Sequence, residues 1–313
     1  MDNQVVASNA DKGADASADS GGDYRTPIRH IRRLSELVDK LDLVICDLWG
    51  VMHNGVTANA DAIDGLLKLR ENGVETVFLS NAPRPRYHVR NQLLAMGMPA
   101  QLTDRIVTSG GLARDAVRAD FHGAKLYHLG PSNDHNTVEG LPVDLVDHPG
   151  KADVILATDL DFRDIDKHRK HLSGARDRSV PLLCANPDRV VHVGENLYVC
   201  AGAVADLYAD MGGTVEWFGK PMPEALQSCI GEVGLPGIAN DRVLMIGDSL
   251  QTDIAGADAA GFLSLLIAGG IHRGEWPSTV AALSNDEISR SAFRQIYGDG
   301  KPTPDWLMHS LVW

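Results

Sequence analysis

Polar and charged side chains stand directly after four of the strand-like segments of this 313-residue chain: Asp47, the pair Ser80 and Asn81, Lys220, and Asp248. An aspartate at a strand tip can act as a nucleophile that splits phosphoryl transfer into formation and hydrolysis of an aspartyl-phosphate. Because the nucleophile and the phosphate are both anionic, this chemistry needs a cation. The carboxylates of Asp47 and Asp248, with the main-chain carbonyl of Trp49, offer the oxygen ligands that Mg²⁺ prefers.

The other candidates divide into catalytic, phosphate-binding and substrate-binding groups. Lys220 would supply a compact positive charge against Asp47 and the transferring oxygens. The Ser80 hydroxyl and the Asn81 main-chain amide would complete a phosphate cradle. Asp253 would hold a water on the metal or orient Lys220, although a carboxylate in the first turn of a helix also has a purely structural explanation.

Asn186 and Asp188 are candidates for substrate contact. A cleft between two domains is where a small-molecule site tends to form. Asn-Pro-Asp is also strong turn chemistry, so these residues could instead shape only a linker.

Helix-like and strand-like segments alternate along most of the chain. Short apolar runs at 43–46 and 243–246 suit parallel strands that are covered on both faces, 76–79 is a further strand, and the helical spacing at 28–40 predicts a helix. The alternation predicts an α/β fold with a doubly wound, Rossmann-like parallel sheet. Ligands of such sheets bind beyond the carboxyl ends of the strands, where the polar candidates stand.

The segment 120–186 differs in character and is interpreted as a smaller α/β cap domain inserted into the core. We therefore assign 25–119 and 187–313 to the core. Residues 1–24 are rich in Ala, Ser, Gly and Asp, and are expected to form a disordered acidic tail.

Composition excludes several classes of protein. The chain is 44% hydrophobic and 23% charged with a formal charge of -13, which is typical of a globular protein and argues against nucleic-acid binding. It has no apolar run long enough for a signal peptide or a membrane span, so neither is expected. The four cysteines form no CxxC pair, which favours reduced thiols and a cytoplasmic location.

The four motifs together resemble those of the haloacid dehalogenase superfamily of aspartate-nucleophile hydrolases. They match Asp47-Leu48-Trp49-Gly50-Val51, Ser80-Asn81, Lys220 and Gly247-Asp248-Ser249-Leu250-Gln251-Thr252-Asp253. Three further segments are similar to the class IIA cap subgroup, which includes nucleotide, sugar-phosphate and pyridoxal-phosphate phosphatases: Ala185-Asn186-Pro187-Asp188-Arg189, Ala201-Gly202-Ala203 and Gly219-Lys220-Pro221. The resemblance implies a Mg²⁺-dependent phosphatase of a small phosphorylated metabolite, with a homodimer formed through the cap as a family expectation.

Trp49 departs from this pattern. Phosphatases of the superfamily carry a second aspartate there, two residues after the nucleophile, which protonates the leaving oxygen and then activates water. An indole N–H does not titrate in water and cannot fill either role. Loss of general acid–base catalysis costs on the order of 10² to 10⁴ in rate, so we expect slow turnover of generic substrates.

Three explanations of Trp49 stay open at this stage. Another group could supply the proton, and His53 is the nearest titratable candidate. The reaction could be metal-independent displacement of halide, since the dehalogenases of the superfamily also carry an aromatic residue there, although their cap is of another class. The chain could also bind or sense a phosphometabolite with little catalysis. Retention of Asp47, Lys220, Asp248 and Asp253 favours the first explanation.

Overall fold

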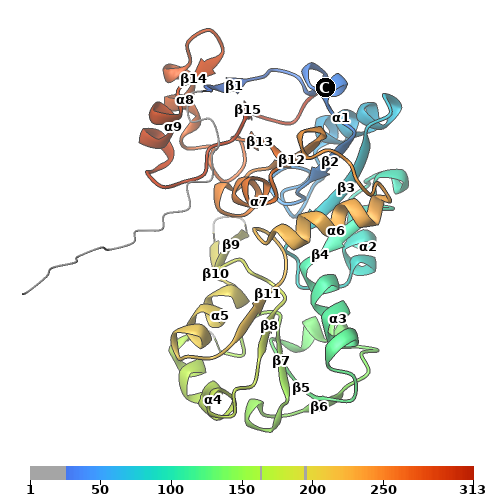
Figure 1. Ribbon diagram of the computed structural model, residues 1–313, viewed down its shortest axis with the longest axis vertical. Coiled ribbons are helices and arrows are strands. Elements are labelled where there is room, and N and C mark those ends of the chain that lie inside the picture. The colour runs from blue at the N-terminus through green and yellow to red at the C-terminus, as the bar shows by residue number, and fades with distance from the viewer. Residues whose placement is uncertain (1–25, 163, 194–195) are drawn as a thin grey trace, which may run out of the picture.

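The computed structural model describes residues 26–162, 164–193 and 196–313, so the predicted tail at 1–24 lies outside the described part. Two sheets dominate the fold, an eight-stranded one in the upper half of Figure 1 and a five-stranded one in the lower half. Their strand orders are β14-β1-β15-β13-β12-β2-β3-β4 and β11-β8-β7-β5-β6. The prediction of an α/β fold with a parallel main sheet and a second, smaller module is confirmed.

The larger sheet is parallel except where β1 meets β14. Its strands are β1 (Ile28–His30), β2 (Leu43–Cys46), β3 (Glu75–Ser80), β4 (Ile106–Thr108), β12 (Val243–Gly247), β13 (Leu263–Ile267), β14 (Glu287–Ile288) and β15 (Trp306–Met308). The predicted strands at 43–46, 76–79 and 243–246 correspond to β2, β3 and β12. These three strands lie side by side in the centre of the sheet.

Both faces of this sheet are buried, which explains why its central strands are mostly apolar. Leu43 and Ile45 of β2 belong to one hydrophobic cluster, and Val44 and Cys46 belong to the cluster on the other face. Helices α1 (Ala60–Glu71) and α2 (Arg86–Ala95) pack on the second face, and α6 (Pro223–Val233) and α7 (Ala255–Ala260) pack on the first. Helices α8 (Trp276–Ala282) and α9 (Arg290–Tyr297) lie beyond β13 near β14 (Figure 1).

The smaller sheet forms the cap. Its strands are β5 (Lys125–Leu129), β6 (Asp144–Val146), β7 (Val154–Ala157), β8 (Leu182–Cys184) and β11 (Val215–Trp217). Helices α4 (Asp166–Asp177) and α5 (Ala201–Asp210) cover one face, and α3 (Ser109–Asp120) covers the other. A hairpin of β9 (Val190–Val193) and β10 (Asn196–Val199) lies between the two sheets in Figure 1.

The predicted cap boundaries at 120 and 186 are too narrow. Strand β11 pairs with β8, and α5 packs on the cap core, although both follow residue 186. Helix α3 begins before residue 120, at Ser109, and places Ala113 and Val117 in the cap core. Periodicity predicts that a segment is a strand or a helix but does not say which of two sheets it joins, and the assignment of α5 and β11 to the core failed for this reason.

The predicted helix at 28–40 is also wrong. The segment begins with β1, which lies between β14 and β15, and continues through the short 3₁₀ turns η1 (Leu34–Glu36) and η2 (Val38–Lys40). Its apolar residues satisfy a helical spacing, but the strand partners of β1 come from more than 250 residues later in the chain. A local sequence pattern carries no information about pairing with such distant segments.

The remaining short helical turns connect the main elements. They are η3 (Ala100–Leu102), η4 (Ser132–Thr137), η5 (Pro149–Lys151), η6 (Asn240–Arg242) and the π-turn η7 (Leu250–Ile254). Within the described ranges, none of the helices combines the length and the apolar character that crossing a bilayer demands.

Candidate active site

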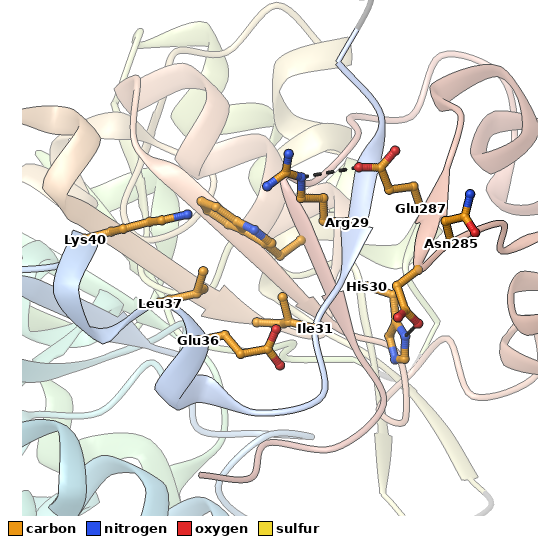
Figure 2. Close-up of a pocket in the computed structure, with 10 residues that line it drawn as sticks. Arg29, His30, Ile31, Glu36, Leu37, Lys40, Asn285 and Glu287 are labelled. Carbon is orange, nitrogen blue, oxygen red and sulfur yellow. Dashed lines mark hydrogen bonds and ion pairs between the residues drawn. The ribbon is translucent and has the colours of Figure 1, made fainter.

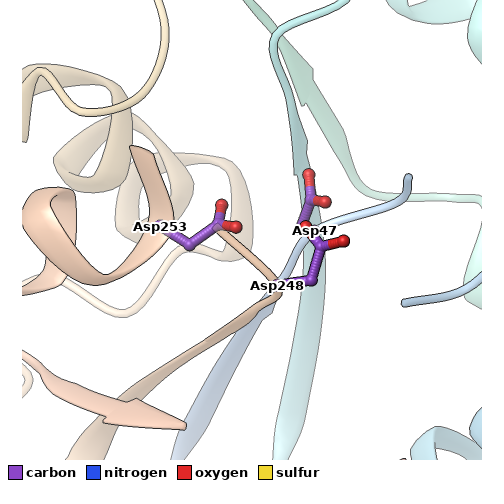
Figure 3. A group of neighbouring side chains, drawn as sticks. All are labelled: Asp47, Asp248 and Asp253. Atoms are coloured by element: carbon purple, nitrogen blue, oxygen red, sulfur yellow. The ribbon is translucent and has the colours of Figure 1, made fainter. Parts of the chain in front are cut away.

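Three aspartates meet at the carboxyl ends of the central strands (Figure 3). Asp47 follows β2 and Asp248 follows β12, and these neighbouring parallel strands pair Cys46 with Ile246. Asp253 comes from η7, directly after β12. Each carboxylate offers an oxygen within 4.8 Å of the other two, and all three side chains are buried. The structure therefore brings the predicted nucleophile and the predicted metal-ligating carboxylates together.

Lys220 places its ammonium among these carboxylates. Its Nζ forms an ion pair with Oδ1 of Asp47 and lies 2.7 Å from Oδ1 of Asp253. Burial opposes the charged form of Lys220, but the charges of Asp253 and Asp47 outweigh it and raise the pKa of the lysine. Lys220 is therefore a permanent cation beside the predicted nucleophile, Asp47.

A single ammonium does not neutralise three buried carboxylates. Burial, opposed by Lys220 and reinforced by Asp253, raises the pKa of Asp47 to about 7. Burial and the charge of Asp47 also raise the pKa of Asp248. Among the described residues, Oδ1 of Asp253 has no partner of good hydrogen-bond geometry, although the lysine lies close to it. An oxygen-only donor set with surplus negative charge fits a small divalent cation such as Mg²⁺.

Glycines allow the main chain to approach these carboxylates. Gly50 has φ +80°, and a Cβ there would lie 1.9 Å from Oδ2 of Asp248. A Cβ at Gly270 would lie 2.2 Å from the same oxygen, which also accepts a hydrogen bond of 3.0 Å from the Ile271 N–H. The role of Gly270 was missed from the sequence. Its signal was the Gly269-Gly270 pair shortly after the apolar strand that ends at 267.

The second motif lies beside the nucleophile because β3 pairs with β2. Ser80 ends β3, and its Oγ accepts a hydrogen bond of 3.2 Å from the Ala82 N–H. The Asn81 side chain is engaged elsewhere: its Oδ1 accepts from the Lys220 N–H at 2.8 Å, and its Nδ2 donates to the Lys220 carbonyl at 3.0 Å. The predicted phosphate contact of Asn81 would therefore use its main-chain amide.

Asn186 and Asp188 lie after the cap strand β8, and the structure separates their roles. Oδ1 of Asn186 accepts a hydrogen bond of 3.3 Å from the Asp188 N–H, which stabilises the local turn. Asp188 instead reaches the core, where its Oδ1 accepts a hydrogen bond of 2.8 Å from Nδ2 of Asn81. Asp188 is therefore connected, through Asn81, to the predicted catalytic residue Lys220. The side-chain oxygen of Asn186 is used in the turn instead.

Trp49 lies in the turn that follows the nucleophile. Its ring meets His53 edge-on, with centroids 6.4 Å apart, and a Cβ at Gly55 would lie 3.6 Å from the indole. Nδ1 of His53 accepts a hydrogen bond of 3.0 Å from the Gly55 N–H, and burial lowers the pKa of this histidine. His53 is therefore neutral near pH 7, which makes it a poor proton donor for a leaving group.

A cavity of about 290 Å³ lies away from this centre (Figure 2). Lys40, which precedes β2, and Trp306, which begins β15, both line it, so it faces the amino ends of the strands. An ion pair of 3.5 Å joins Arg29 to Glu287 at its wall. The three clustered carboxylates stand at the opposite ends of the strands, so the cavity is not part of their site.

Comparison with known proteins identifies this arrangement. Residues 44–143 match the sequence model of the Haloacid dehalogenase-like hydrolase family, and residues 217–290 match a second HAD-like hydrolase model. The crystal structure of a haloacid dehalogenase-like hydrolase from Brucella suis 1330 is 33% identical to this chain, covers 90% of it and 100% of that structure, and has a TM-score of 0.74. This chain belongs to the haloacid dehalogenase-like hydrolase family. The predicted family, with its class IIA cap, is confirmed.

Two further similar proteins show how far the similarity extends. Sugar-phosphatase AraL of Bacillus subtilis is 25% identical over 244 residues, which is 74% of this chain and 85% of that protein. The crystal structure of glycerol phosphate phosphatase Rv1692 from Mycobacterium tuberculosis in complex with magnesium is 22% identical, with a TM-score of 0.62. It covers 80% of this chain and 74% of that one, and at this identity it supports the fold alone.

Proposed function

We propose that this haloacid dehalogenase-like hydrolase is a Mg²⁺-dependent phosphatase of small phosphorylated metabolites. The observation that carries the proposal is the buried group of Asp47, Asp248 and Asp253 around the Lys220 ammonium. The family membership and the phosphatase relatives support the same class of reaction. A cytoplasmic location is also proposed, supported by the four cysteines, which are all buried free thiols.

In this proposal Asp47 is the nucleophile that accepts the phosphoryl group. Lys220 stabilises the developing charge on the transferring oxygens, and Ser80 with the Asn81 main-chain amide binds the phosphate. Asp47, Asp248 and the Trp49 carbonyl would ligate Mg²⁺, and Asp253 would orient Lys220. Bound Mg²⁺ would offset the repulsion between the carboxylates and the phosphate.

Turnover of generic substrates is proposed to be slow because Trp49 replaces the carboxylate that protonates the leaving group. His53 does not compensate for this loss, since its lowered pKa keeps it neutral. Substrates whose leaving group needs no protonation, such as aryl phosphates and acyl phosphates, are expected to react faster than alkyl phosphates.

The direct test is release of phosphate from a panel of phosphorylated metabolites, with Mg²⁺ and with EDTA. We expect release with Mg²⁺ and none above background with EDTA. Chloride release from 2-haloacids in EDTA, without phosphate release in Mg²⁺, would instead show a dehalogenase. Mg²⁺-dependent ligand stabilisation without any product would contradict catalysis.

Mg²⁺ affinity is expected to weaken as the pH falls. Burial raises the pKa of Asp47 to about 7 and also raises the pKa of Asp248, so protons compete with Mg²⁺ for both carboxylates as the pH falls. For each displaced proton, affinity falls by about tenfold per pH unit below the carboxyl pKa. Isothermal titration calorimetry at pH 6, 7 and 8 measures this trend, and Asp248→Asn should remove most of the binding. An affinity that is the same at pH 6 and pH 8 would contradict this prediction.

A further inference from the structure

The catalytic lysine stands where the chain returns from the cap to the core. Strand β11 of the cap ends at Trp217, and α6 of the core begins at Pro223, so Lys220 lies in the short connection between them. Two residues before it, both the N–H and the carbonyl of Phe218 form hydrogen bonds. The Phe218 N–H donates to the Cys184 carbonyl at 3.1 Å, and the Phe218 carbonyl accepts from the Ser109 hydroxyl. The position of Lys220 therefore depends on where the cap lies.

The side-chain amide of Asn81 fixes this connection. It bonds to both the N–H and the carbonyl of Lys220, and it is itself buried. The contact is close enough to require glycine at the preceding position: Gly219 has φ +104°, and a Cβ there would lie 2.5 Å from Oδ1 of Asn81. The amide can make these two bonds in only one of its two flipped orientations, because its oxygen must face the Lys220 N–H.

Asp188, which belongs to the cap, favours the same orientation of the Asn81 amide. Its carboxylate only accepts hydrogen bonds, so the 2.8 Å contact with Asn81 requires the NH₂ of the amide to point toward it. Asp188 is itself held by the cap, since the Gly202 N–H of α5 donates to its carbonyl at 3.1 Å. A Cβ at Gly202 would lie 2.5 Å from that carbonyl oxygen, which leaves the Asp188 main chain little freedom to move.

We propose that Asp188 is a positioning residue through which the seated cap, acting on the Asn81 amide, holds the main chain of Lys220 so that its ammonium stays against Asp47. The inference rests on the phosphatase proposed above, for which Lys220 stabilises the transition state. It makes the catalytic lysine sensitive to the cap: lifting the cap withdraws Asp188 and frees the amide to turn.

The test compares Asp188→Ala with Asp188→Asn on 4-nitrophenyl phosphate in saturating Mg²⁺. Asp188→Ala should lower kcat by about tenfold and change KM by less than about twofold, because the lysine acts on the transition state. Asp188→Asn should keep kcat within about threefold of the wild type, since its amide oxygen can still accept from Asn81. Both variants should keep the wild-type pH profile. Asp177→Ala, at an exposed carboxylate of the same cap, is the matched control.

A double substitution tests whether Asp188 acts through Asn81. Asn81→Ala with Asp188→Ala should be no slower than Asn81→Ala alone, within about twofold, because the second change removes a bond that no longer exists. Circular dichroism checks that each variant folds. If Asp188→Ala does not fold, Asp188→Ser replaces it, since a serine hydroxyl is too short to reach Asn81 from the same main chain.

Three results would overturn the inference. The first is wild-type kcat in Asp188→Ala. The second is full additivity of the two alanine substitutions. The third is equal damage in Asp188→Asn and Asp188→Ala with a lost limb of the pH profile, which would make Asp188 a proton donor instead. In all three outcomes the wild type is still active, so the proposed phosphatase stands. A wild type that releases no phosphate would overturn both the proposed phosphatase and this inference.

Discussion

Asp47→Asn is expected to lower Mg²⁺-dependent phosphate release by at least about 10³-fold, because asparagine cannot attack phosphorus to form the acyl-phosphate. The fold should survive. Lys220 keeps its contact with Asp253, and loss of the Asp47 charge removes one of the causes, after burial, that raise the pKa of Asp248. The measurement is initial-rate phosphate release by the wild type and the variant on the same substrate.

The control for this experiment is Asp39→Asn, which makes the same chemical change at an exposed position outside the catalytic group. It should retain wild-type activity. Equal release by wild type and Asp47→Asn, with both folded, would contradict the nucleophile assignment. A trace of contaminating phosphatase would show itself in the same way, so both proteins need identical purification.

Trp49→Asp is expected to raise the hydrolysis of an alkyl phosphate such as glycerol phosphate by about 10²-fold. The new carboxyl group would stand two residues after the nucleophile and could donate a proton to the leaving oxygen, and general acid catalysis contributes on the order of 10² to 10⁴ in rate. The gain should be smaller on 4-nitrophenyl phosphate, whose leaving group needs no protonation, so that only the activation of water by the new carboxylate remains. The two substrates therefore separate proton donation from a general improvement of the site.

Trp49→Asn is the matched control because it removes the same indole and differs from aspartate only in its inability to titrate. Both variants lose the edge contact with His53 and the packing against Gly55, so any cost of the missing ring is common to them. Faster turnover in Trp49→Asp than in Trp49→Asn supports the missing acid as the cause of slow reaction. Equal rates in two folded variants would contradict it and favour another proton donor or another reaction.

Local sequence was sufficient to predict the strands that carry the candidate catalytic residues. Predominantly apolar runs identified β2, β3 and β12 because a strand buried on both faces carries few polar side chains, Thr76 of β3 being an exception. The polar residue after each run then marked a strand end, and parallel strands bring their carboxyl ends to one edge of the sheet. The approach of Asp47, Asp248 and Asp253 follows from this rule together with the order of the motifs.

The extent of the cap and the partners of β1 could not be predicted in this way. Strand β11 looks the same in sequence whether it pairs with the cap strand β8 or with the core, and β1 obtains its partners from the far end of the chain. Pairing is a choice between distant segments, and it depends on packing that no local window contains.

The sequence alone therefore determined the residue types at the candidate site and their order along the chain. The proposed phosphoryl transfer requires a carboxylate, a hydroxyl and an ammonium, and these can be recognised without knowing where they lie in space. The folded structure decided which partner each of these groups contacts. It engaged the Asn81 side chain with the main chain of Lys220, held the Asn186 side-chain oxygen in a turn, and joined Asp188 of the cap to Asn81 of the core. Each of these outcomes depends on which hydrogen-bond partner lies within about 3 Å, and only the packed structure determines that distance.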